Sequence, residues 1–136
     1  MFYLAEYYRD NSDYKNAIIY YQKSFTLKPD YSQSYLGISK AYFAIKDYPN
    51  TLNFLNKYIG YNQNSDIAYA LRAEANLKLN NITNAEKDIQ HAITIEENIS
   101  YLLTEAIILY SKGDYGNAKN KLTILSKNVQ TSEVYK

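Results

Sequence analysis

The sequence predicts an all-α solenoid of four antiparallel helix pairs, in one domain over residues 1–136. The first observation is a repeat, because the length of 136 residues equals four units of 34 and a shift by that step superimposes like residues. The matches are Asp13-Tyr14 with Ala17, Asp47-Tyr48 with Thr51, Asn81-Ile82 with Ala85 and, one residue early, Asp114-Tyr115 with Ala118. The second observation is the helical spacing of small and apolar residues around each match, without the strict alternation of a strand. A fixed period of this length is typical of stacked repeats.

The same spacing places two helices in each unit. They are expected at about 1–11 and 14–28, 32–45 and 48–61, 66–79 and 82–95, and 99–112 and 115–127. The four repeats are expected at about 1–31, 32–65, 66–98 and 99–131, with a tail at 132–136. Helices this short are marginal alone in water, so each pair must bury its apolar stripe against its neighbours.

The turn between the helices of each pair has its own residues. Gly113 adopts a left-handed backbone without steric cost and Asn80 does so cheaply, while Ser12 and Lys46 hold the same place in the first two units. After these turns Asp13, Asp47 and Asp114 are expected to cap the second helices. Pro29 closes the second helix of the first unit, and Pro49 is tolerated in the first turn of a helix.

Composition argues against catalysis and cofactor chemistry. The chain has no cysteine and one histidine, His91, so no thiolate nucleophile, disulfide or imidazole metal cluster is expected. The adjacent pair Glu96-Glu97 diverges at a helix end and is interpreted as solvated, and His91 is expected to face solvent. No glycine-rich phosphate loop or nucleophile motif is present. We therefore expect a protein that is not an enzyme and binds no metal or cofactor.

Charge and hydropathy limit the partners. Fifteen basic against fourteen acidic residues give a net charge of +1, and Lys alternates with Glu, so nucleic-acid binding is not expected. No apolar run approaches the roughly 20 residues of a membrane helix, and the first residues lack the features of a secretory signal. A cytoplasmic location is expected, with a periplasmic or secreted one left open.

The repeat resembles the tetratricopeptide repeat, a 34-residue helix–turn–helix unit with fixed small and large packing positions. The resemblance covers essentially the whole chain and rests on four units in register. The matching residues are Leu4, Ala5, Tyr8, Ala17, Tyr21, Ser24 and Pro29; Tyr35, Ile38, Ser39, Tyr42 and Leu55; Tyr69, Ala73, Ala85, Ile89 and Ala92; and Leu102, Ala106, Leu109, Ala118 and Leu122. It implies a right-handed superhelix whose first helices line a concave groove.

Several positions depart from the family pattern. Thr51 and Tyr58 replace small residues where helices approach closely, and Gln63 and Glu97 stand where the closing proline would be. The Lys and Asn of the family's two-carboxylate clamp are absent, so chaperone-tail binding is not the favoured interpretation.

The resemblance also implies which residues line the groove. Carried over position by position, they are Phe2, Glu6, Arg9, Gln33, Leu36, Lys40, Phe43, Ala70, Glu74, Leu77, Lys78, Leu103, Ile107 and Tyr110. The apolar members Leu36, Phe43, Leu77, Ile107 and Tyr110 are expected to contribute most affinity. Alternatively, Phe43, Leu77 and Tyr110 pack against the second helices.

The expected function is a non-enzymatic scaffold that binds a peptide or helix of a partner protein in this groove. Two alternatives stay open. The repeat ends carry no polar capping helix, so the chain is also a candidate for a self-assembling array through its uncapped ends. The other alternative is a regulatory repeat segment of a larger protein.

Overall fold

The computed structural model describes the backbone of residues 1–134 and the side chains of residues 1–127. Over that part the chain forms eight helices and no strand. They are α1 (Phe2–Asp10), α2 (Tyr14–Leu27), α3 (Gln33–Ala44), α4 (Tyr48–Tyr61), α5 (Asp66–Lys78), α6 (Ile82–Ile95), α7 (Ile99–Lys112) and α8 (Tyr115–Val134). The predicted all-α fold is confirmed, and the bounds of the first seven helices agree with expectation to within one residue.

The last helix differs from its prediction. α8 was expected to end at residue 127 but continues to Val134, through part of the expected tail. The segment 117–134 contains neither glycine nor proline, so it lacks the two residues that disfavour a helix most strongly. Residues 135–136 lie outside the described part of the chain.

The turn inside each pair adopts the conformation that the sequence predicts. Ser12, Lys46, Asn80 and Gly113 have positive φ angles of 60°, 63°, 62° and 94°. Directly after three of these turns, the carboxylates of Asp13, Asp47 and Asp114 accept hydrogen bonds from the backbone N–H three residues later. In each case the residue at that position is an asparagine, whose side-chain amide donates to the second carboxylate oxygen at 2.8 Å.

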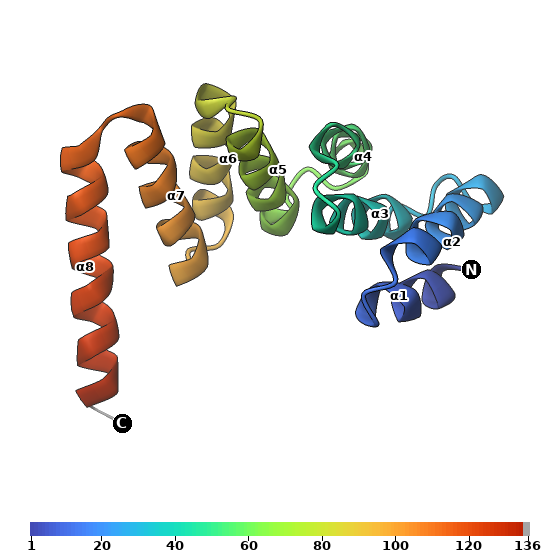
Figure 1. Cartoon of the computed structure of the whole chain (residues 1–136), viewed down its shortest axis with the longest axis horizontal. Helices are drawn as coiled ribbons and strands as arrows, with labels where there is room; N and C mark the ends of the chain where they lie inside the picture. Colours follow the sequence, from blue (N-terminus) through green and yellow to red (C-terminus); the bar gives the residue numbers. More distant parts are fainter. Residues whose placement is uncertain (135–136) are drawn as a thin grey trace.

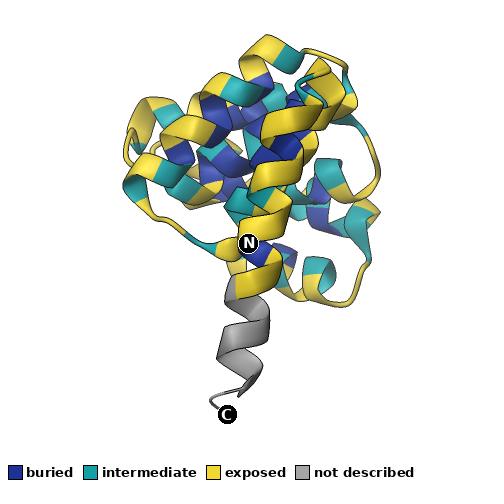
Figure 2. Ribbon diagram, turned by 90° about the vertical axis from the view of Figure 1, so that its left-hand side faces the viewer, coloured by how far each residue is buried: buried dark blue, intermediate teal, exposed yellow. Residues whose placement is uncertain are grey.

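The helices follow one another along an arch (Figure 1), and each packs on the next in sequence. The odd-numbered helices lie on the inner side of this arch and contact each other in the order α1, α3, α5, α7. Buried residues lie between neighbouring helices, whereas the outward surfaces are exposed (Figure 2). We call the surface of the odd-numbered helices on the inside of the arch the inner face.

Neighbouring helix pairs pack closely where the second helix of one pair meets the first helix of the next. The contact between α2 and α3 is an example. The fully buried ring of Tyr21 lies directly against the backbone of Gly37, and its hydroxyl donates a hydrogen bond to the carboxylate of Glu6. Beside it the hydroxyls of Ser24 and Ser34 are hydrogen-bonded at 2.7 Å. Small residues on α3 therefore let α2 approach closely enough to bury a large ring.

A polar junction joins α4, α5 and α6. The guanidinium of Arg72 on α5 donates to both carboxylate oxygens of Asp88 at 2.9 and 2.8 Å. A third nitrogen donates to the side-chain oxygen of Asn56 on α4 at 3.0 Å. Here the apolar core divides into two clusters, one extending to Ala68 on α5 and the other beginning at Ala70.

The Tyr21–Gly37 contact gives a prediction about stability. A Cβ at Gly37 would lie 2.3 Å from Cε1 of Tyr21, so Gly37→Ala should force this ring or the helix to move. We expect a loss of about 1–3 kcal/mol in the free energy of unfolding, measured by chemical denaturation.

Gly60→Ala is the matched control. A Cβ at Gly60 would meet no atom within 4 Å, so alanine should stabilise α4 by up to about 1 kcal/mol through helix propensity. Equal effects of the two substitutions would contradict the importance of close approach at Gly37.

Candidate protein-binding face

The residues expected to line the groove belong to the odd-numbered helices and lie at very different depths. Leu36 and Ala70 are buried in the core, and Phe2, Glu6, Arg9, Lys40, Phe43, Glu74 and Leu77 are partly buried. Gln33, Lys78, Leu103, Ile107 and Tyr110 are exposed. The residues on the first half of the arch are thus more enclosed than those on α7.

The five apolar residues expected to contribute most affinity separate accordingly. Leu36 belongs to the first core cluster, and Leu77 packs against the second. The ring of Phe43 lies edge-on to Tyr48 of α4, with ring centres 5.6 Å apart. Only Ile107 and Tyr110 combine an apolar side chain with broad exposure, although Tyr110 also contacts Tyr115 of α8.

Glu6 and Arg9 form a closed polar group on α1. A guanidinium nitrogen of Arg9 lies 2.9 Å from one carboxylate oxygen of Glu6, and the hydroxyl of Tyr21 donates to the other. Burial and this hydrogen bond raise the pKa of Tyr21 above its ordinary value, so the phenol stays protonated and keeps donating. Both charged side chains are therefore satisfied within the protein.

Lys40 and Glu74 lie at equivalent positions of α3 and α5, and neither has such a partner. Among the described residues, no carboxylate lies within 4.0 Å of the ammonium of Lys40, and Glu74 accepts no hydrogen bond. Burial lowers the pKa of Lys40, and the charge of Arg9 lowers it further against the opposing effect of Glu6. Burial also raises the pKa of Glu74, an effect partly offset by Lys78. Lys40 and Glu74 are thus partly desolvated charges that form no ion pair within 4.0 Å among the described residues, although Glu6 and Lys78 act on them from farther away.

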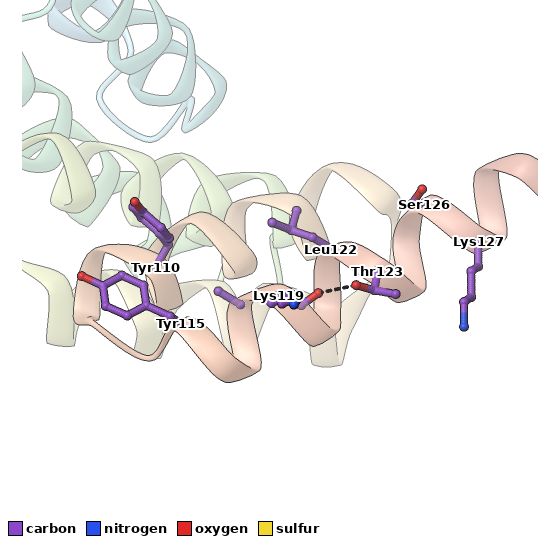
Figure 3. A pocket seen from close by; sticks show the side chains of 8 residues that line it. Tyr110, Tyr115, Lys119, Leu122, Thr123, Ser126 and Lys127 are labelled. Carbon is purple, nitrogen blue, oxygen red and sulfur yellow. Dashed lines mark hydrogen bonds between the residues drawn. The ribbon is translucent and has the colours of Figure 1, made fainter.

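A recessed surface lies beside Tyr110, between α7 and α8, and we call it the α7–α8 groove. It encloses about 900 Å³ and is lined by Tyr110, Tyr115, Ala118, Lys119, Leu122, Thr123, Ser126 and Lys127. Figure 3 shows the rings of Tyr110 and Tyr115 side by side at one end, with Leu122 farther along α8. Of these residues only Tyr110 was expected at a binding surface.

The described side chains offer no arrangement for metal binding. Within residues 1–127, no three His, Cys, Asp or Glu side chains are close enough to share an ion. His91 is exposed as expected, and its ring lies edge-on to Tyr69 with centres 4.3 Å apart. In the described part of the chain, no helix has the length and hydropathy needed to cross a bilayer.

Comparison with known families agrees with this geometry. Residues 2–31 and 67–99 match the family model of the tetratricopeptide repeat. These two regions are tetratricopeptide repeats. No protein with curated annotation matches the sequence significantly.

Solved structures of tetratricopeptide repeat proteins share the fold. MamA from Desulfovibrio magneticus RS-1 is 18% identical with a TM-score of 0.90, over 96% of this chain and 74% of that one. The first tetratricopeptide domain of Spaghetti (RPAP3), bound to the HSP90 peptide SRMEEVD, is 21% identical with a TM-score of 0.78, over 82% and 92%. YrrB, a tetratricopeptide protein with an unusual peptide-binding site, is 16% identical with a TM-score of 0.82, over 93% and 66%.

The environment of Glu74 gives a second prediction. Because its raised pKa means that the ionised carboxylate is disfavoured in the folded protein, Glu74→Gln should raise the melting temperature at neutral pH. A carboxyl group whose pKa is raised by folding favours the folded protein at low pH, where it is protonated. As the pH rises and the group ionises, the free energy of unfolding falls. The gain of the glutamine variant should therefore vanish below the ordinary pKa range of a glutamate.

Thermal unfolding followed by circular dichroism across this pH range measures the effect. Glu97→Gln, at an exposed position, is the control and should leave the melting temperature unchanged. A Glu74→Gln variant that melts at or below the wild-type temperature at neutral pH would contradict the assigned burial cost.

Proposed function

We propose that this protein is an interaction scaffold whose inner face binds an extended segment of a partner protein. The observation that carries the proposal is the row of accessible polar and apolar side chains on four adjacent inner helices, which includes two partly buried charges, Lys40 and Glu74, that form no ion pair within 4.0 Å among the described residues. Two proteins of the same fold support it, since one is bound to a peptide and the other has a peptide-binding site.

The unpaired charges indicate the chemistry of the bound segment. Lys40 and Glu74 have lost part of their hydration, and Glu6 and Lys78 compensate this only from a distance, so a ligand that forms a direct ion pair with each recovers part of that cost. The segment should therefore carry a carboxylate opposite Lys40 and a cation opposite Glu74. Beyond them, the exposed Leu103 and Ile107 on α7 favour an apolar side chain.

The order and spacing of these groups follow from the arch. α3, α5 and α7 are in contact, and packed helices have axes about 8–10 Å apart. An extended chain rises about 3.3 Å per residue, so it needs about three residues to pass from one inner helix to the next. The proposed segment therefore carries an acidic, a basic and an apolar residue in this order, with two residues between each and the next.

A library of random peptides of about nine residues, long enough to pass over three inner helices, tests this order. Peptides selected on the purified protein should be enriched in the acidic–basic–apolar order at three-residue spacing. The double variant Lys40→Glu with Glu74→Lys should select peptides with the two charges exchanged. The control double variant Lys15→Glu with Glu97→Lys exchanges exposed charges off the inner face and should select the original order.

Two other outcomes separate the claims. Peptides that bind the inner face without a charge order would overturn the proposed ligand chemistry and leave the scaffold function standing. A library that yields no binder dependent on the inner face would overturn both.

A single substitution measures the apolar part of the site. Ile107→Asp removes an exposed apolar side chain and adds a charge, so the selected peptides should bind roughly tenfold or more weakly, a loss of about 1.4 kcal/mol or more. Fluorescence anisotropy with a labelled peptide gives the dissociation constants. Ile124→Asp, at an exposed position on α8, should bind as the wild type does. Equal loss in both variants would argue against a contact at Ile107.

A further inference from the structure

The α7–α8 groove exposes a position that is buried everywhere else in the chain. Leu122 on α8 is 44% exposed. Its equivalents in the three preceding repeats, Tyr21, Leu55 and Ile89, are all 0% exposed. Each of them lies on an even-numbered helix that the next odd-numbered helix covers, as α3 covers Tyr21. The groove is therefore a junction surface of the same kind without a covering helix.

The first helix shows the opposite half of such a junction. Tyr7 on α1 is 61% exposed, whereas its equivalents Ala41, Ala75 and Ile108 are all 0% exposed. Those three residues lie on odd-numbered helices that pack against the preceding even-numbered helix. Tyr3 and Leu4 beside Tyr7 are also exposed and extend this apolar surface. α1 thus presents the face with which its counterparts cover a junction.

The two exposed surfaces are complementary in size. On α1, the rings of Tyr3 and Tyr7 are larger than the residues at the same positions of the internal covering helices, which are Gly37, Leu71 and Thr104 for Tyr3 and Ala41, Ala75 and Ile108 for Tyr7. On α8, Ser126 is smaller than its equivalents Phe25, Ile59 and Ile93. The larger side chains on α1 are thus matched by a smaller residue on α8, as close packing of the two surfaces would require.

Charge is complementary as well. At the junction of α6 and α7, Glu86 and Lys112 form an ion pair at 3.0 Å. The equivalent of Glu86 on α8 is Lys119, which lines the groove, so the sign there is reversed. On α1 the position equivalent to Lys112 is Asn11, and the exposed Asp10 directly before it carries the charge opposite to that of Lys119.

We propose that copies of this chain stack head to tail, with the exposed face of α1 on one copy seated in the α7–α8 groove of the next. The contact joins two different surfaces, so it leaves a free surface at each end and continues into longer assemblies. Stacking in this way leaves the inner face open and joins the arches of successive copies.

Light scattering as a function of protein concentration tests the stacking. The weight-average mass should rise above the monomer mass of 15.8 kDa as concentration increases. Tyr7→Lys and Leu122→Lys each place a charge in one half of the contact, and both residues are exposed, so the fold should be retained as judged by circular dichroism. Each variant alone should remain a monomer, whereas the control Ile124→Lys, 58% exposed on α8, should assemble like the wild type.

Mixing the two variants gives the decisive measurement. The Tyr7→Lys protein keeps an intact groove and the Leu122→Lys protein keeps an intact α1 face, so an equimolar mixture should form a dimer of twice the monomer mass and nothing larger. A wild-type protein that stays monomeric at every concentration overturns the proposal. So does a wild-type assembly that survives both substitutions, or a mixture that remains monomeric, because either result shows that another surface is used.

Discussion

The helices of this chain depend on their neighbours in sequence to bury their apolar sides. The contact of Tyr21 with Gly37 shows how this is achieved, because a large ring becomes fully buried only where the neighbouring helix offers bare backbone. The short helices contribute little stability of their own, so the free energy of folding resides mainly in these junctions. Where a following helix covers the junction the central side chain is fully buried, whereas the equivalent Leu122 on α8 is 44% exposed.

This dependence also shapes the inner face. The side chains that could bind a partner stand on the helices that form the junctions, so several of them are drawn into the core. Leu36 and Ala70 are used for packing, while Lys40 and Glu74 are left partly dehydrated beside them. These two charges reduce the stability of the free protein. They are also the groups through which the proposed partner segment, with charges of opposite sign, would gain affinity. Stability and recognition thus oppose each other at the same two positions.

Repetition explains how much could be predicted from sequence. The four turns were predicted correctly, even with the uncommon residues Ser12 and Lys46 in a left-handed conformation, because the pattern identified their positions independently of their propensity. The pairing of each capping aspartate with an asparagine three residues later was present in the sequence and could have been predicted too. The extra length of α8 was missed because no neighbouring repeat marks its end.

The depth of each inner-face residue was not predictable from the pattern. Equivalent positions hold residues of different size, so the surroundings of each side chain differ from one junction to the next. Phe43 and Leu77 were expected either at the surface or against the second helices, and only the packed structure decides between these environments. Arg72 is a further example, since its role depends on Asp88 and Asn56 lying on two other helices.

The polar junction at Arg72 separates the apolar core into two bodies. An array of repeats unfolds cooperatively only as far as neighbouring units are strongly coupled through their interfaces. In this chain α5 provides that coupling, because it contributes Ala68 to one cluster and Ala70 and Ala73 to the other. The two halves of the solenoid therefore share a single helix as their common support.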